Sequence, residues 1–179
     1  MRRSRRSSRL GNDGKVECEM KLGIMSDSHD NMPLIAKAVA LFNSEKVDLV
    51  LHAGDFVSPF TNIEFRKLDA KMVAVFGNND GDKPYLLKRF ADIGEIQDDP
   101  RELELDGRKI VLMHQPKFLE SLHAASGYDL VVYGHTHKVD IREGKPLIVN
   151  PGETGGWLYG KCMVVTLDLK TMLPMIHPL

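Results

Sequence analysis

The stretch LGIMSDSH, residues 22–29, shows the plan of this chain, because an apolar run ends there in polar side chains that could bind a metal. Four later segments repeat the plan: VDLVLHA before Gly54-Asp55, MVAVF before Gly77-Asn78-Asn79-Asp80, IVLM before His114, and DLVVY before Gly134-His135-Thr136-His137. In open α/β sheets, ligand sites collect beyond the carboxyl ends of the strands. We therefore expect these five polar segments to meet at one edge.

The first half of the chain alternates predicted strands and helices. LGIMS is typical of a buried strand, and Pro33 can then begin a helix without losing a needed N–H. Apolar residues recur at near-helical spacing over 33–45. The next predicted strand is VDLVLHA, and a helix that includes Leu68 follows from Pro59. The third predicted strand is KMVAVF, followed by a short helical turn at 84–91. The order β-α-β-α-β indicates a parallel sheet covered by helices.

The second half favours hairpins. RELELDGRKIVLM places two strand-like runs around Asp106-Gly107, a strong hairpin signal. FLESLHAAS predicts a helix and YDLVVY a strand, KVDIREGKPLIVN two strands around Glu143-Gly144, and KCMVVTLDL the closing strand. We expect an α/β fold of two packed mixed β-sheets flanked by helices, a four-layer αββα sandwich.

Size and composition fit an ordinary globular protein. The 179 residues suit one domain, with 42% hydrophobic and 27% charged residues. The formal net charge of -1 gives the whole chain no attraction to nucleic acid, and no apolar stretch is long enough to span a membrane. Cys18 and Cys162 form no CxxC pattern, so we expect no disulfide framework and a cytoplasmic location.

Residues 1–19 differ from the rest and predict a basic, flexible extension before a domain at 20–179. Six basic against three acidic residues give this tail a charge of +3 and leave the remainder near -4. Too few apolar residues are present to bury a face. A basic arm could touch nucleic acid or a membrane surface. The simpler interpretation is a mobile extension, or an upstream start with the true start at Met20.

Taken singly, each polar motif is weak, since Asp-x-His and Gly-Asp also occur in ordinary turns. Taken together, and each placed after a buried strand, the motifs supply imidazoles, carboxylates and an amide oxygen to one edge. That set suits a pair of divalent metal ions. It indicates metal-assisted attack on a phosphate ester.

The combined motifs resemble the calcineurin-like metallophosphoesterase superfamily, and more narrowly its small single-domain phosphodiesterases, a group that includes the retromer subunit of the same fold. The resemblance runs from Met20 to the C-terminus. It also covers Ser26-Asp27-Ser28-His29-Asp30-Asn31 and Asn150-Pro151-Gly152.

The resemblance implies two metal sites. One ion would be bound by Asp27, His29, Asp55 and His137, and the other by Asp55, Asn78, His114 and His135, with Asp55 as the bridge. Mixed oxygen and imidazole ligands suit Mn, which we expect first, and also Ni, Fe or Zn. A hydroxide between the ions would attack phosphorus, and the substrate would be a small or nucleotide-like phosphodiester. Neutral imidazoles are needed for binding, so activity should fall in acid.

Two residues depart from the family pattern. Many members have His, thought to assist the leaving group, where this chain has Asn79. Asn cannot donate a proton as an acid, so we expect a preference for good leaving groups. Gln115 stands where Gly is frequent and could narrow access. Asp80 could orient a ligand or cap its turn.

The remaining candidates are expected to be structural. We expect His52 to be a hydrogen-bonded core residue and His123 and His177 to be solvated. Trp157 and Tyr159 could form a substrate wall or an oligomer contact, but packing is the simpler expectation. Two other functions stay open: a non-catalytic protein-interaction scaffold of the same fold, and a nuclease. Neither a membrane nor nucleic acid is an expected partner, and a homo-oligomer is compatible with the sequence.

Overall fold

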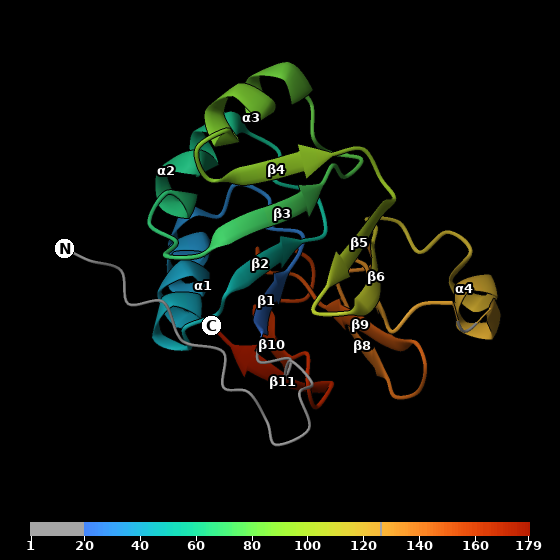
Figure 1. Ribbon diagram of the computed structural model, residues 1–179. Coiled ribbons are helices and arrows are strands. Elements are labelled where there is room, and N and C mark those ends of the chain that lie inside the picture. The colour runs from blue at the N-terminus through green and yellow to red at the C-terminus, as the bar shows by residue number, and fades with distance from the viewer. Residues whose placement is uncertain (1–19, 126) are drawn as a thin grey trace.

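A six-stranded and a five-stranded β-sheet face each other in the computed structural model, which describes residues 20–125 and 127–179 (Figure 1). Helices cover the outer face of each sheet. Both sheets contain parallel and antiparallel neighbours. The expected four-layer α/β sandwich is therefore confirmed.

The six-stranded sheet has the order β11-β10-β1-β2-β3-β4. Its parallel part comprises β1 (Lys21–Met25), β2 (Leu49–His52), β3 (Lys71–Val75) and β4 (Gly94–Gln97). Its antiparallel part comprises β10 (Met163–Asp168) and the edge strand β11 (Leu173–Pro178). The crossovers carry α1 (Met32–Ser44), η1 (Pro59–Thr61), α2 (Asn62–Phe65) and α3 (Lys83–Phe90).

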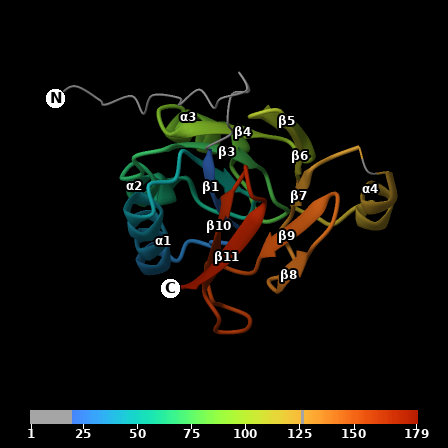
Figure 2. The ribbon, with the colours of Figure 1, turned by 60° about the horizontal axis from the view of Figure 1, so that its bottom comes forward.

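The five-stranded sheet has the order β5-β6-β7-β9-β8. Its strands are β5 (Arg101–Leu105), β6 (Arg108–Leu112), β7 (Leu130–Val132), β8 (Val139–Arg142) and β9 (Leu147–Pro151). The predicted hairpin at Asp106-Gly107 joins β5 and β6. Helix α4 (Leu119–Ala125) lies outside this sheet. Figure 2 shows β8 and β9 beside β10 and β11, where the two sheets come together.

Three apolar clusters separate the layers. Side chains of both sheets, among them Ile24, Leu51 and Val132, are buried in one cluster between the sheets. The opposite faces of β2 and β3 pack with α1 residues such as Phe42. A third cluster lies between α4 and the second sheet. Because strand side chains alternate between faces, continuous apolar runs supply two cores at once.

The structure corrects several expectations. Strands β4 and β11 were not predicted, because the first is a short GEIQ segment and the second contains two prolines. The helix from Pro59 is shorter than expected and ends before Leu68. His177 is half-buried and hydrogen-bonded to the Thr166 hydroxyl at 2.8 Å, whereas His123 is exposed as expected. Residues 1–19 and Ser126, the predicted end of α4, lie outside the described residues.

None of the helices in the described part of the chain is both long and apolar enough to cross a bilayer.

Candidate metal centre

The seven predicted metal ligands come from five loops at the carboxyl ends of strands in both sheets. Asp27 and His29 follow β1, Asp55 follows β2, and Asn78 follows β3. His114 follows β6, and His135 and His137 follow β7. Parallel pairing within each sheet brings its strand ends to one edge, and packing of the sheets brings the two edges together. Only the topology joins residues more than 100 positions apart.

The first group comprises Asp27, His29, Asp55 and His137, each of which offers one ligand atom within 4.8 Å of the others. The His29 and His137 Nε2 atoms are 3.3 Å apart. His137 Nε2 lies 3.4 Å from Asp27 Oδ1, and His29 Nε2 lies 3.5 Å from Asp55 Oδ2. Four donor atoms therefore face one small volume.

The second group comprises Asn78, His114 and His135, and it adjoins the first through Asp55. The Oδ1 atom of Asn78 is 2.8 Å from both His114 Nε2 and His135 Nδ1. His114 Nε2 also lies 3.4 Å from Asp55 Oδ2. One carboxylate oxygen of Asp55 thus faces both groups.

Hydrogen bonds behind two imidazoles direct their lone pairs into the site. His114 Nδ1 lies 2.8 Å from the carbonyl oxygen of Ala53, which can only accept, so this nitrogen carries the proton. His137 Nδ1 lies 2.9 Å from the carboxylate of Glu153 and donates to it. In each ring, the other nitrogen is then free to bind a cation. Partners of this kind orient metal-binding histidines and raise their basicity.

Backbone strain is concentrated at the same residues. Asp27, His29, Asp55, His135 and His137 have φ between 40° and 66°, in the left-handed region that residues other than glycine seldom adopt. Each such residue costs on the order of 1–3 kcal/mol and persists only where the surroundings impose it. Such clustering is typical of functional sites.

Asp27 carries an oxygen that has no hydrogen-bond partner in the part of the chain that the structure describes. Its Oδ2 accepts from the Ser26 hydroxyl at 2.6 Å and from the backbone N–H of His135 at 3.0 Å. Its buried Oδ1 accepts nothing, although buried polar atoms are almost always paired. Burial raises the pKa of Asp27 above its usual value. A cation beside Oδ1 would remove both anomalies, so these residues fit a metal ion.

The predicted catalytic residues Asn79 and Asp80 surround Asp55. The backbone N–H and the side-chain amide of Asn79 donate to the two oxygens of Asp55, each at 2.8 Å. Asp80 accepts from the backbone N–H groups of Asp55, Val57 and Gly77 at 3.1, 2.8 and 2.7 Å. Burial raises the pKa of Asp80 despite these bonds. Asp80 therefore caps its own turn and fixes the Asp55 loop, while any role in the reaction stays a prediction.

His52 is a core residue, as expected. It is fully buried and stacks on Phe56 with ring centroids 3.7 Å apart. Its Nδ1 accepts from the N–H of Gly54 at 3.1 Å, and its Nε2 lies 3.2 Å from the Ser28 hydroxyl. Burial, with His114 and His29 nearby, holds the pKa of His52 well below its usual value.

Glu153 was missed, because it follows the Asn150-Pro151-Gly152 turn without any metal-binding spacing. The residue is fully buried. Besides His137, its carboxylate accepts from the backbone N–H of Leu158 at 3.1 Å and of Tyr159 at 2.6 Å. Burial alone would raise the pKa of Glu153, but the His137 and backbone hydrogen bonds outweigh it and lower the pKa. Glu153 thereby joins a candidate ligand to the loop 155–161.

The prediction that Trp157 and Tyr159 pack is wrong. Their exposed fractions are 64% and 50%, and Leu158 between them is equally open. The Trp157 indole N–H donates to the carbonyl oxygen of His29 at 2.9 Å. This loop therefore presents apolar side chains to solvent beside the first ligand group.

The chain matches the family described as calcineurin-like phosphoesterase superfamily domain over residues 20–172. It is 44% identical to phosphodiesterase MJ0936 of Methanocaldococcus jannaschii over 156 residues, 84% of this chain and 94% of the relative. A solved archaeal phosphodiesterase superposes with a TM-score of 0.84 at 40% identity, over 89% of this chain and 100% of the other. Vps29 of Entamoeba histolytica, solved with Zn²⁺, shares the fold alone, with a TM-score of 0.57 at 18% identity over 89% and 98% of the two chains.

Proposed function

Because the chain belongs to the calcineurin-like phosphoesterase superfamily and is a metal-dependent phosphodiesterase, we propose that it hydrolyses a small or nucleotide-like phosphodiester with two divalent ions. The observation that carries the two-ion proposal is the position of Asp55. Its Oδ2 lies 3.5 Å from His29 Nε2 and 3.4 Å from His114 Nε2, so it faces a ligand group on either side. A carboxylate in that position can bridge two ions.

The seven side chains divide between the ions as the family pattern implies. Asp27, His29 and His137 would bind the first ion, and Asn78, His114 and His135 would bind the second. Oxygen and imidazole donors suit Mn²⁺, with Ni, Fe and Zn as alternatives. A cytoplasmic location completes the proposal.

When bound, two such ions lower the pKa of a coordinated water and offset the charge that develops on phosphoryl oxygens. The chain's own groups prepare the site for this chemistry. Glu153 and the Ala53 carbonyl keep protons on the outer nitrogens of His137 and His114. The two N–H groups of Asn79 keep the Asp55 carboxylate oriented.

Asn79 also limits the range of substrates. Its side chain cannot supply a proton to a departing alkoxide, an assistance typically worth about 10²–10⁴-fold. The enzyme should therefore prefer diesters whose leaving group departs without protonation. Asn79→His should raise activity on phosphomonoesters relative to diesters if the loop keeps its geometry.

The direct test uses a chromogenic diester. Chain treated with chelator should not hydrolyse bis(4-nitrophenyl) phosphate, and added Mn²⁺ should restore turnover. The wild type should hydrolyse this diester faster than an unactivated alkyl phosphomonoester, and Asn79→His should narrow the difference in kcat/KM. Undiminished hydrolysis in excess chelator would contradict a metal-dependent reaction.

One observation favours a protein-interaction scaffold as the second candidate. Trp157 and Leu158 are both 64% exposed, and Leu173 and Met175 on edge strand β11 are 68% and 61% exposed. Since Vps29, which shares only the fold, has been solved with Zn²⁺, metal binding alone does not demonstrate catalysis. Turnover that depends on Asp55 does. The nuclease alternative rests on the arginine-rich tail, which lies outside the described residues.

A further inference from the structure

A groove opens beside His137 of the first ligand group. Its volume is about 530 Å³, and its walls come from β8, β10, β11 and the loop 155–161. Figure 2 shows these strands side by side. His137 belongs both to this groove and to the first ligand group, so a molecule held by the ions could extend into it. The lining residues besides His137 are Lys138, Val139, Gly152, Tyr159, Lys161, Met163 and Ile176.

The groove carries positive charge that the described carboxylates do not neutralise. Lys138 and Lys161 line it, and none of its described lining residues is acidic. Within residues 20–125 and 127–179, neither ammonium group forms an ion pair, that is, neither lies within 4.0 Å of a carboxylate. The cavity beside Asn78 and His114 differs, because Asp98 and Asp99 line it with Lys83 and Lys117, and Lys83 is paired with Asp98 at 2.9 Å.

The remaining walls of the groove are apolar and aromatic. Val139, Met163 and Ile176 supply aliphatic surface. The Tyr159 ring is half exposed, and the Lys138 ammonium lies 5.2 Å from its centroid. The N–H of Tyr159 is fixed by the buried carboxylate of Glu153 at 2.6 Å. A half-exposed ring, an aliphatic wall and two ammonium groups without a carboxylate partner among the described residues are complementary to an apolar or aromatic body that bears an anion.

We propose that this groove is the subsite for one ester group of the phosphodiester, and that it selects a group with an apolar or aromatic body and a second negative charge. The inference rests on the proposed function, since it places the first phosphate at the metal centre. Lys138 and Lys161 face the second charge, and Tyr159 contacts the body of the group. A phosphate and a carboxylate share this chemistry.

Ligands with a P–C bond test the subsite without turnover. The probes are benzylphosphonate, 4-carboxybenzylphosphonate and 1,4-bis(phosphonomethyl)benzene, titrated calorimetrically into the full chain with and without Mn²⁺. Each exposed charge pair contributes modestly, so the two charged derivatives should bind about three- to tenfold more tightly than benzylphosphonate. The preference should shrink as salt rises. The ratio of the two derivatives shows whether phosphate or carboxylate is favoured.

Two double variants identify the source of the preference. Lys138→Ala/Lys161→Ala should bring the Kd values for benzylphosphonate and 4-carboxybenzylphosphonate to within about twofold of each other. The matched control is Lys37→Ala/Lys88→Ala, which removes the same charge from exposed positions on α1 and α3 and should keep the preference. Tyr159→Ala should weaken all three ligands alike.

Equal Kd values for benzylphosphonate and its charged derivatives in the wild type overturn the proposal. A preference that survives loss of both lysines overturns it too. The proposed function fails by a different result, namely no metal-dependent turnover of bis(4-nitrophenyl) phosphate. If that occurs while the lysine-dependent preference is present, the anion subsite stands and the phosphodiesterase assignment falls.

Discussion

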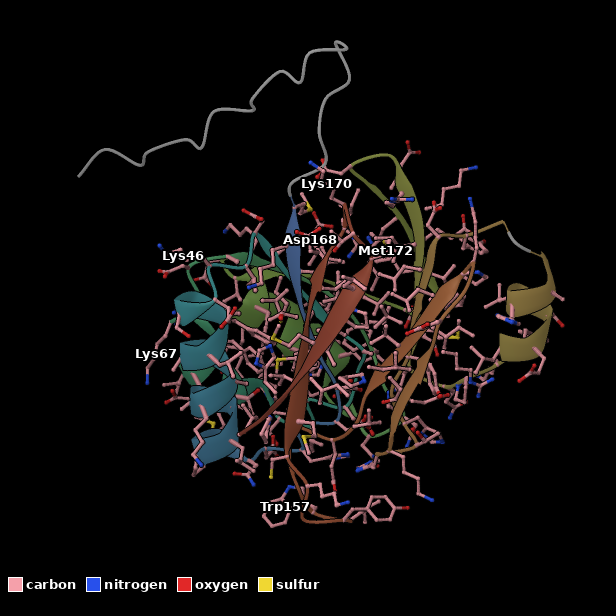
Figure 3. The ribbon with its side chains drawn as sticks, turned by 90° about the horizontal axis from the view of Figure 1, so that it is seen from below. Lys46, Lys67, Trp157, Asp168, Lys170 and Met172 are labelled. Atoms are coloured by element: carbon pink, nitrogen blue, oxygen red, sulfur yellow. The ribbon has the colours of Figure 1, made fainter. Side chains whose placement is uncertain are left out.

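The two ends of the six-stranded sheet use the same backbone conformation for different purposes. Figure 3 shows Asp168, Lys170 and Met172 together at one end and Trp157 at the other. At the first end, Met172 has a φ of 56°, and Asp168 Oδ1 accepts from the backbone N–H groups of Lys170 and Thr171, both at 2.9 Å. The strained residue there belongs to a tight turn whose polar groups find partners within a few positions.

At the metal end, a local hydrogen bond such as that from Ser26 to Asp27 is only part of what supports the strained residues. Five of the seven candidate ligands have a left-handed backbone conformation. Asp27 Oδ1 has no hydrogen-bond partner among the described residues. Further support comes from hydrogen bonds to distant segments. The backbone N–H of His135 donates to Asp27, and that of Asn79 donates to Asp55. We infer that a strained turn stabilised by its own hydrogen bonds has a structural role. Strained residues that distant segments hold around an acceptor without a partner instead indicate a functional site.

The largest effect should come from removing one carboxylate at each end of the sheet and comparing the two variants. Asp55→Asn removes the proposed bridging charge. Loss of a group that only orients a metal ligand typically lowers activity by about 10–100-fold, and kcat/KM should fall by more than this in Asp55→Asn. Asp168→Ala should leave kcat/KM unchanged and cost about 1 kcal/mol of unfolding free energy. Diesterase assays and urea unfolding measure the two. Equal losses of activity in both variants would contradict the comparison.

Glu153→Gln should have the next largest effect. The amide keeps the shape of the side chain, but it removes the charge that His137 Nδ1–H meets at 2.9 Å. Metal affinity or kcat/KM should fall by about 10–100-fold. Calorimetric titration of Mn²⁺ into the metal-free chain measures this directly. Glu120→Gln, on exposed α4, is the control and should bind as the wild type does. Unchanged affinity in Glu153→Gln would show that its role is confined to the loop 155–161.

Two glycines of one loop sharpen the comparison further. A Cβ at Gly77 would lie 2.0 Å from Asp55 Oδ1 and 2.5 Å from its backbone nitrogen, whereas a Cβ at Gly81 would meet no atom within 4 Å. Gly77→Ala should therefore displace Asp55, cost about 1–3 kcal/mol of unfolding free energy and weaken Mn²⁺ binding. Gly81→Ala should change stability by less than about 0.5 kcal/mol. Similar behaviour of the two variants would mean that Asp55 can move at little cost.

The smallest effect concerns pH and is measured on metal-free protein. Since the pKa of His52 is lowered in the folded state, the unfolded chain takes up a proton first as the pH falls below about 6.5. Stability should then decline by up to about 1.4 kcal/mol per pH unit until His52 itself titrates. Asp27 and Asp80 act in the opposite sense, because their pKa values are raised in the folded state. Their protonation as the pH falls increases the stability of the folded protein.

The difference between wild type and His52→Gln isolates the imidazole. That difference should depend on pH below about 6.5. A flat difference for His52 would show that the buried ring does not resist protonation.

Most of the fold followed from the sequence, because apolar runs and turn residues signal their structure locally. The run LGIM, the Asp106-Gly107 turn and the helix from residue 33 were predicted, and the structure confirms each as β1, the β5–β6 hairpin and α1. Strand β11 lacks such a signal, since Pro174 and Pro178 break its pattern, and only its edge position tolerates them.

The candidate ligands could be selected in the sequence because each follows a buried strand. Their division into two groups around Asp55 could not be derived from spacing, since it depends on how the two sheets pack. Glu153 was invisible because its partners, His137 and Tyr159, become neighbours only after folding. Trp157 was misjudged because aromatic residues are usually buried, and no local pattern marks an exposed one.

The central claim is that seven side chains hold two divalent ions with Asp55 between them. Anomalous diffraction from crystals of the full chain soaked in Mn²⁺ tests it most directly. Two anomalous peaks are expected about 3.5–4 Å apart, both within bonding distance of Asp55, one beside Asp27, His29 and His137 and the other beside Asn78, His114 and His135. A single peak, or a second peak bound by other residues, would contradict it.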